Sequence, residues 1–84
     1  MTEVKLLSLN VRGLQDSKKR RELFLWLKLN HKGSKSFILL QETHSKIEDE
    51  LLWEKEWGSQ ILFSHGTSQS RGVVILFPKV TLFK

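Results

Sequence analysis

Two apolar segments of strand length flank one helix-length amphipathic segment, and this order restricts the possible folds more than any other feature of the sequence. Residues 4–10 (VKLLSLN) and 36–41 (SFILLQ) are nearly continuous apolar runs, which is typical of strands covered on two sides. A helix between two strands lets the chain cross back over a sheet, whereas an antiparallel pair needs only a tight turn. We therefore expect two parallel strands joined by a right-handed crossover.

The segment between these strands has a helix start signal, an apolar face and a basic face. Asp16 or Ser17 can cap the helix, and the turn before it contains Gly13. Three apolar residues have the i, i+3, i+4 spacing of a buried helix face: Leu23, Trp26 and Leu27. The basic run at 18–21 (KKRR) is expected to be a solvated face, with nuclear localisation or DNA contact as the alternative.

The remaining sequence predicts a second helix and then two strands. The helix is expected to begin at Ser45, because Ser45 and Glu48 form the S-x-x-E pattern of a capping box. Its apolar residues at i, i+4 spacing are Ile47 and Leu51, with Trp53 and Trp57. Residues 60–64 and 72–77 predict a hairpin with a long polar loop, and 80–84 begin another strand-like segment. The helical spacing of all three tryptophans favours core packing over stacking on bases.

Composition narrows the class of protein. A chain of 84 residues with 39% hydrophobic content is one small domain or a piece of a larger one. Because there is no cysteine, disulfides and thiolate metal sites are excluded. No apolar run is long enough for a membrane span or a signal peptide, so we expect an intracellular protein without a membrane partner. The net charge of +5 favours polyanions such as nucleic acid as partners.

Polar side chains follow both predicted parallel strands, at the point where each strand ends. Asn10 comes at the end of the first strand and Glu42 directly after the second. Because parallel strands end at the same edge of a sheet, we expect these two side chains to be neighbours. A carboxylate beside an amide can hold a hard cation such as Mg²⁺. The alternatives are an asparagine that caps a loop and a solvated glutamate.

The local sequence at this edge resembles a known superfamily. The segments LNVRGL (9–14), LQETH (40–44) and RGVVIL (71–76), in this order, resemble the endonuclease/exonuclease/phosphatase superfamily. They are most similar to the apurinic-type endonuclease domain at the N-terminus of non-LTR retrotransposon polyproteins. The resemblance covers nearly all of residues 1–84, but only the N-terminal part of that domain. It implies an incomplete two-layer α/β sandwich with the element order β-α-β-α-β-β.

The resemblance also implies roles for individual residues. Glu42 would be the catalytic carboxylate that ligates Mg²⁺ or Mn²⁺, and Asn10 would lie beside the metal and the scissile phosphate of DNA. His44 would orient groups near the metal or the phosphate, with an exposed loop histidine as the alternative. Arg12 departs from the repair-type members, which carry an acidic residue there, and suits the retrotransposon branch. It would contact a DNA phosphate or simply be a solvated loop arginine.

Several groups that the family's catalysis needs are not in this sequence. There is no tyrosine, and neither aspartate, Asp16 or Asp49, lies in an Asp-x-Asn or Ser-Asp-His context. We therefore expect an N-terminal fragment of a DNA endonuclease that is inactive alone and located in the nucleus if it acts on chromosomal DNA. The alternative is a non-catalytic basic module that binds nucleic acid or a partner chain. An incomplete sandwich would also allow self-association through an uncovered sheet.

Overall fold

The computed structural model describes residues 4–30, 35–66 and 71–78, and there the elements follow the predicted order. They are β1 (Val4–Asn10), α1 (Ser17–Asn30), β2 (Lys35–Gln41), the short 3-10 turn η1 (Ile47–Asp49), α2 (Glu50–Trp57), β3 (Ile61–Ser64) and β4 (Val73–Leu76). The predicted strand at 80–84 lies outside the described residues. The chain is therefore a small α/β protein, as its sequence predicts.

The four strands form one mixed sheet in the order β1-β2-β4-β3. β1 and β2 are parallel, as expected, with Asn10 opposite Gln41 at the end of the pair. β3 and β4 are antiparallel, which confirms the hairpin. β4 also pairs antiparallel with β2. The start of β4 is therefore placed beside the ends of both β2 and β3.

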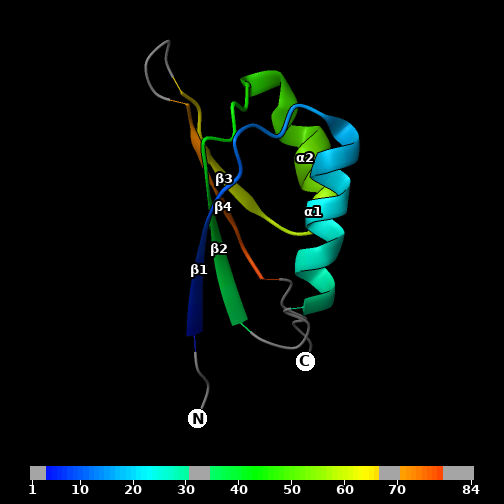
Figure 1. Cartoon of the computed structure of the whole chain (residues 1–84), viewed down its shortest axis with the longest axis vertical. Coiled ribbons are helices and arrows are strands. Elements are labelled where there is room, and N and C mark those ends of the chain that lie inside the picture. Colours follow the sequence, from blue (N-terminus) through cyan, green and yellow to red (C-terminus); the bar gives the residue numbers. More distant parts are fainter. Residues whose placement is uncertain (1–3, 31–34, 67–70, 79–84) are drawn as a thin grey trace.

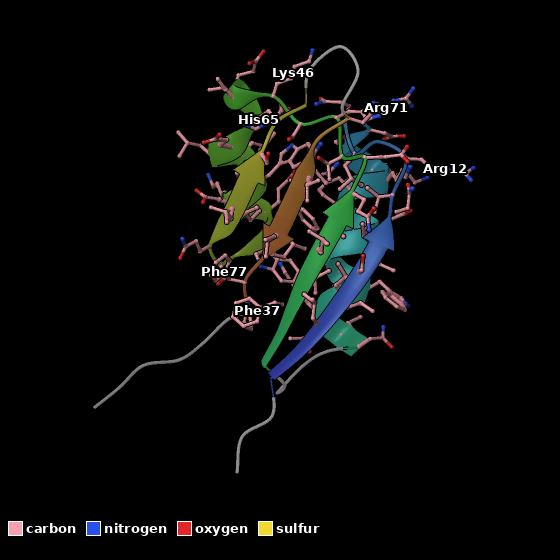
Figure 2. The ribbon with its side chains drawn as sticks, turned by 90° about the vertical axis from the view of Figure 1, so that its left-hand side faces the viewer. Arg12, Phe37, Lys46, His65, Arg71 and Phe77 are labelled. Atoms are coloured by element: carbon pink, nitrogen blue, oxygen red, sulfur yellow. The ribbon has the colours of Figure 1, made fainter. Side chains whose placement is uncertain are left out.

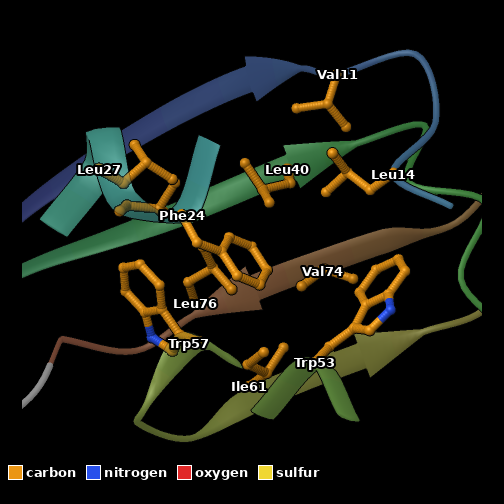
Figure 3. Packing of buried hydrophobic residues seen from close by; sticks show 11 residues of the cluster. Val11, Leu14, Phe24, Leu27, Leu40, Trp53, Trp57, Ile61, Val74 and Leu76 are labelled. Carbon is orange, nitrogen blue, oxygen red and sulfur yellow. The ribbon is translucent and has the colours of Figure 1, made fainter. Parts of the chain in front are cut away.

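Both helices lie against the same face of the sheet, which gives two layers (Figure 1). Side chains on this face of the strands meet side chains of the helices and of the loop after β1. The buried hydrophobic residues are Val11, Leu14, Phe24, Leu27, Ile38, Leu40, Trp53, Trp57, Ile61, Val74 and Leu76. Burial of each large apolar side chain contributes roughly 1.5–3 kcal/mol. This one cluster therefore holds the two layers together (Figure 3).

The face of the sheet that points away from the helices also has apolar side chains. Figure 2 shows the sheet from this side, with the helices behind the strands. Leu6 is 72% exposed and Leu62 is 52% exposed, and Phe37 and Ile75 are half-buried. The expectation that residues 4–10 are covered on both faces is therefore wrong for the described part of the chain. The apolar run reflects a strand whose outward residues are also apolar.

The first helix has the predicted cap, and Leu23 packs against the core as expected, but its buried face differs from the prediction at one position. The carboxylate of Asp16 accepts hydrogen bonds from the backbone N–H of Lys18 at 2.9 Å and of Lys19 at 3.4 Å, which confirms Asp16 as the cap. Leu27 is buried, but Trp26 is 51% exposed. Phe24 takes the place in the core instead, and its ring lies 5.6 Å from that of Trp57 in an edge-to-face arrangement.

The second helix begins later than its sequence predicts. Ser45 does not cap it, because the Ser45 hydroxyl bonds His65 instead. The carboxylate of Asp49 accepts a hydrogen bond from the backbone N–H of Lys46 at 2.9 Å, and α2 follows from residue 50. Of the predicted apolar positions, Trp53 and Trp57 are buried, whereas Ile47 and Leu51 are exposed. The tertiary partner of Ser45 thus overrides the local capping pattern.

One residue of the basic run is buried, against expectation. Lys18, Lys19 and Arg21 are exposed, but Arg20 is only 3% exposed. Its guanidinium pairs with the Glu56 carboxylate through bonds of 2.5 and 3.1 Å. It also donates to the Leu14 carbonyl oxygen at 2.9 Å and lies 5.2 Å from the Trp53 ring centroid. Arg20 therefore joins the loop after β1 to α2, and it does so with its charge satisfied.

Replacing Arg20 is expected to destabilise the fold far more than replacing its exposed neighbour. Arg20→Ala leaves the Glu56 carboxylate and the Leu14 carbonyl without their partner, so the free energy of unfolding should fall by about 3 kcal/mol. Arg21→Ala removes the same charge from the helix surface and should change it by less than about 0.5 kcal/mol. Urea unfolding followed by tryptophan fluorescence measures both; equal losses would contradict the assigned role of Arg20.

Candidate functional site

Three chain segments meet at the edge of the sheet where β1 and β2 end and β4 begins. On one side of residues 42–44, Gly13 N–H donates to the Glu42 carbonyl at 2.6 Å and Leu14 N–H to the Thr43 carbonyl at 3.0 Å. On the other side, the Glu42 N–H donates to the Gly72 carbonyl at 3.0 Å. These bonds continue the sheet ladder past the ends of the strands. The segment that carries Glu42 is thus held from both sides by backbone.

Three residues at this edge, in the loops after β1 and β2, have unusual backbone conformations. Arg12, Glu42 and His44 have φ angles of 52°, 59° and 58°, in the left-handed region that costs L-residues other than glycine roughly 1–2 kcal/mol each. Such residues persist only where surrounding contacts hold them, and they concentrate at functional sites. Here the backbone bonds described above supply those contacts. All three residues are among those that the sequence singles out.

Asn10 and Glu42 lie side by side, as the parallel-strand prediction requires. Asn10 Nδ2 donates to Glu42 Oε2 at 2.7 Å, although the residues are 32 positions apart. Asn10 Oδ1 accepts a hydrogen bond from the Arg12 backbone N–H at 3.2 Å, which fixes the amide. Glu42 is half-buried and Asn10 is exposed. The amide therefore orients the carboxylate at an edge that solvent can reach.

The pair presents hard oxygen donors of the kind that Mg²⁺ and Mn²⁺ prefer. Within residues 4–30, 35–66 and 71–78, Glu42 Oε1 has no hydrogen-bond partner, and no cluster of three or more acidic or histidine side chains gathers around a common point. Among the described residues, the pair of Asn10 and Glu42 would therefore offer a cation one carboxylate and at most one amide oxygen. That set fits Mg²⁺, which usually keeps several waters and takes only one or two protein carboxylates together with substrate phosphate.

The other two predicted site residues lie next to this pair. Arg12 is exposed, and its side chain extends from the loop after β1 at the same end of the molecule as Arg71 and Lys46 (Figure 2). His44 is exposed, and its ring is close to Gly13, where an added Cβ would lie 3.7 Å from His44 Nδ1. The structure thus brings all four predicted residues to one edge.

Sequence reasoning missed a chain of hydrogen bonds behind this edge. Ser45 Oγ lies 2.8 Å from His65 Nδ1, and His65 Nε2 lies 2.6 Å from Glu50 Oε2. Thr43, which follows Glu42, is fully buried and its hydroxyl lies 3.5 Å from that of Ser45. These residues come from two loops and α2. Because their proximity arises only when β3 packs beside α2, the sequence carries no local signal for it.

No described helix of the chain is both long enough and apolar enough to cross a bilayer. This agrees with the apolar runs of the sequence, which are all of strand length or belong to the amphipathic α1.

Replacing Gly72 by alanine is expected to cost about 2–4 kcal/mol of unfolding free energy. Gly72 has φ +87°, and an added Cβ would lie 3.1 Å from the Gly66 nitrogen and 3.3 Å from the Ser64 carbonyl oxygen, both backbone atoms. Gly58 has φ +88°, but an added Cβ would meet only the flexible Lys28 side chain, at 4.0 Å from Nζ, so Gly58→Ala should cost only about 1 kcal/mol. Thermal or urea unfolding compares them; equal losses would show that the crowding at Gly72 is unimportant.

The chain is similar to the transposon TX1 uncharacterized 149 kDa protein of Xenopus laevis, with 42% identity over 55 residues. The matched segment is 66% of this chain but 4% of that protein, so the chain spans a small part of this curated relative's length. No family model and no solved structure matches the chain. The resemblance to the endonuclease superfamily therefore depends on the motif residues themselves, and the comparison supports a transposon origin for the sequence.

Proposed function

We propose that this chain is the N-terminal part of a Mg²⁺-dependent DNA endonuclease of the retrotransposon type, which hydrolyses phosphodiester bonds. The single observation that carries this proposal is the hydrogen bond between Asn10 and Glu42 at 2.7 Å. It joins the LNVRGL and LQETH segments, which are the two most specific parts of the family resemblance. The similarity to a transposon protein adds support for the retrotransposon type.

Each residue of the pair has a distinct task in this proposal. Glu42 holds the cation through its carboxylate, and Asn10 keeps that carboxylate in place with its amide N–H while Arg12 N–H holds the Asn10 oxygen. A bound Mg²⁺ or Mn²⁺ supplies Lewis-acid chemistry, since it neutralises charge on a phosphate oxygen. The Asn10 bond to Oε2 and the backbone bonds of residue 42 orient the carboxylate before any ligand binds.

The basic side chains around the pair suit a DNA backbone. Arg12, Lys46 and Arg71 are exposed at this end of the molecule (Figure 2), and the exposed His44 lies at the same edge. Guanidinium groups bind phosphate oxygens in a bidentate manner. Such contacts position a nucleic acid without reading its sequence. They place a phosphodiester next to Glu42 in the proposed complex.

Cleavage needs more than these residues. A nucleophile-activating base and a leaving-group acid are required for hydrolysis, and in the family they come from the tyrosine, Asp-x-Asn and Ser-Asp-His positions that this sequence lacks. We infer that the 84-residue chain binds a cation and DNA but does not nick DNA by itself. Its net charge of +5 and exposed basic edge equally favour the second candidate, a non-catalytic module that binds nucleic acid.

Removing the Glu42 carboxylate is expected to weaken Mn²⁺ binding by at least about ten-fold, because Glu42 is the charged ligand of the proposed site and no group of three or more acidic or histidine side chains among the described residues could replace it. Glu42→Gln keeps the size of the side chain and removes its charge. Glu48→Gln is the matched control, since Glu48 is an exposed acid of η1. Water-proton relaxation during Mn²⁺ titration measures each dissociation constant. Unchanged Mn²⁺ binding in Glu42→Gln would refute the proposed cation site.

DNA binding by the chain should depend steeply on salt and on Arg12. Each phosphate contact contributes about −0.9 to the slope of log K against log salt concentration, so Arg12→Ala should reduce the slope's magnitude by about 1. Lys55→Ala removes an equal charge from the end of α2 and should leave the slope unchanged. Fluorescence anisotropy of a labelled duplex at several salt concentrations provides the slopes.

The same preparations test whether the chain cleaves DNA. The chain should not convert supercoiled plasmid to the nicked form in Mg²⁺, whereas cleavage that disappears in Glu42→Gln would show that 84 residues suffice for catalysis. Binding that is insensitive to salt, or absent, would refute both the DNA-backbone contacts and the binding module.

A further inference from the structure

We propose that His65 is a positioning residue that clamps the Glu42 segment through Ser45. The imidazole bridges Ser45 Oγ, 2.8 Å from Nδ1, and Glu50 Oε2, 2.6 Å from Nε2. Ser45 directly follows residues 42–44, of which Glu42 and His44 have left-handed φ angles. Its side-chain bond is therefore the next restraint after the backbone bonds that hold Glu42 and His44.

For a neutral imidazole, the chemistry of the partners fixes the direction of every hydrogen bond in this series. The Glu50 carboxylate can only accept, so His65 Nε2 carries a hydrogen and donates it. In the neutral ring Nδ1 is then an acceptor, and the Ser45 hydroxyl donates to it. The oxygen of Ser45 is left to accept from the Thr43 hydroxyl, 3.5 Å away. Each group in the series thus donates a hydrogen bond to the next, from Thr43 to Glu50. In this order, neighbouring hydrogen bonds strengthen one another.

A hydrogen-bonded series of a serine, a histidine and an acid also suggests nucleophilic catalysis. The burial of this set instead favours a role in positioning the Glu42 segment. Ser45 is only 6% exposed, and Thr43 beside it is fully buried. The imidazole is packed against Phe63, with ring centroids 5.4 Å apart. A substrate would have to displace these groups to reach the hydroxyl. The set is therefore suited to holding the loop rather than to attacking a ligand.

The clamp connects the site to three other parts of the fold. Glu50 begins α2, His65 follows β3, and the next residue, Gly66, packs against Gly72, whose carbonyl accepts the Glu42 N–H. Loss of the His65 bonds would free Ser45 from both α2 and the end of β3. The Glu42 segment could then relax from its costly left-handed conformation. The geometric clamp is independent of any cation, whereas its effect on cation affinity rests on the proposed function.

Amide hydrogen exchange, measured by NMR, tests the clamp directly. His65→Phe keeps a ring against Phe63 and removes both hydrogen bonds. It should accelerate exchange of the Glu42, Thr43 and His44 amides by about ten-fold relative to the Leu40 and Val74 amides in the sheet. Ser45→Ala should do the same. The double variant should add little to either single change, because both remove the same link.

Two further variants separate positioning from a general loss of stability. Leu62→Ala lies on the open face of β3 and should raise exchange across the whole sheet without a preference for the Glu42 segment. His65→Gln retains one donor and one acceptor, so it should restore most of the protection. Uniform acceleration in His65→Phe, or failure of glutamine to rescue, would overturn the proposal.

Mn²⁺ affinity gives a second readout that distinguishes this proposal from the proposed function. In His65→Phe the Mn²⁺ dissociation constant should rise about five- to ten-fold with little change in the unfolding midpoint. If wild-type Mn²⁺ binding does not depend on Glu42, the cation site is refuted, and the exchange pattern still decides whether His65 clamps the segment. If binding depends on Glu42 but His65→Phe changes neither affinity nor exchange, the clamp alone is refuted.

Discussion

The parallel pairing of β1 with β2 determines where every candidate site residue lies. With Asn10 opposite Gln41 in this pair, the residue after β2 is placed beside the end of β1, and the Asn10 amide reaches the Glu42 carboxylate. A shift of the register by one residue would turn Asn10 to the other face of the sheet. The crossover helix makes the parallel pairing possible, and burial of its apolar face against the sheet holds the helix in place.

Beyond the strand ends, backbone hydrogen bonds replace the sheet ladder. Residues 42–44 lie between the loop after β1 and the start of β4, and they bond to both. This double support explains how Arg12, Glu42 and His44 tolerate left-handed backbone angles. Arg20 anchors the loop after β1 by donating a hydrogen bond to the Leu14 carbonyl oxygen. The buried ion pair and the strained edge are therefore parts of one arrangement.

Several elements were predictable because their causes are local. Asp16 caps α1 as expected, since its carboxylate is within reach of the first free N–H groups. The proximity of Asn10 to Glu42 followed from the parallel direction of the two strands alone. Other predictions were wrong where tertiary partners outweighed local patterns. Ser45 bonds His65 rather than the helix N-terminus, and Phe24 rather than Trp26 enters the core. The 3.6-residue period allows either choice, and the position of α2 decides it.

The sequence by itself determined the order of the elements, the parallel first pair and the meeting of Asn10 and Glu42 at its edge, because apolar periodicity and strand polarity are properties of short segments. Only the tertiary structure decided that Arg20 is buried and that His65 is linked to Ser45 and Glu50. The same is true of the left-handed backbone at Glu42. These features arise from contacts between residues far apart in the chain, and each is stable only because several packed elements supply its partners at once.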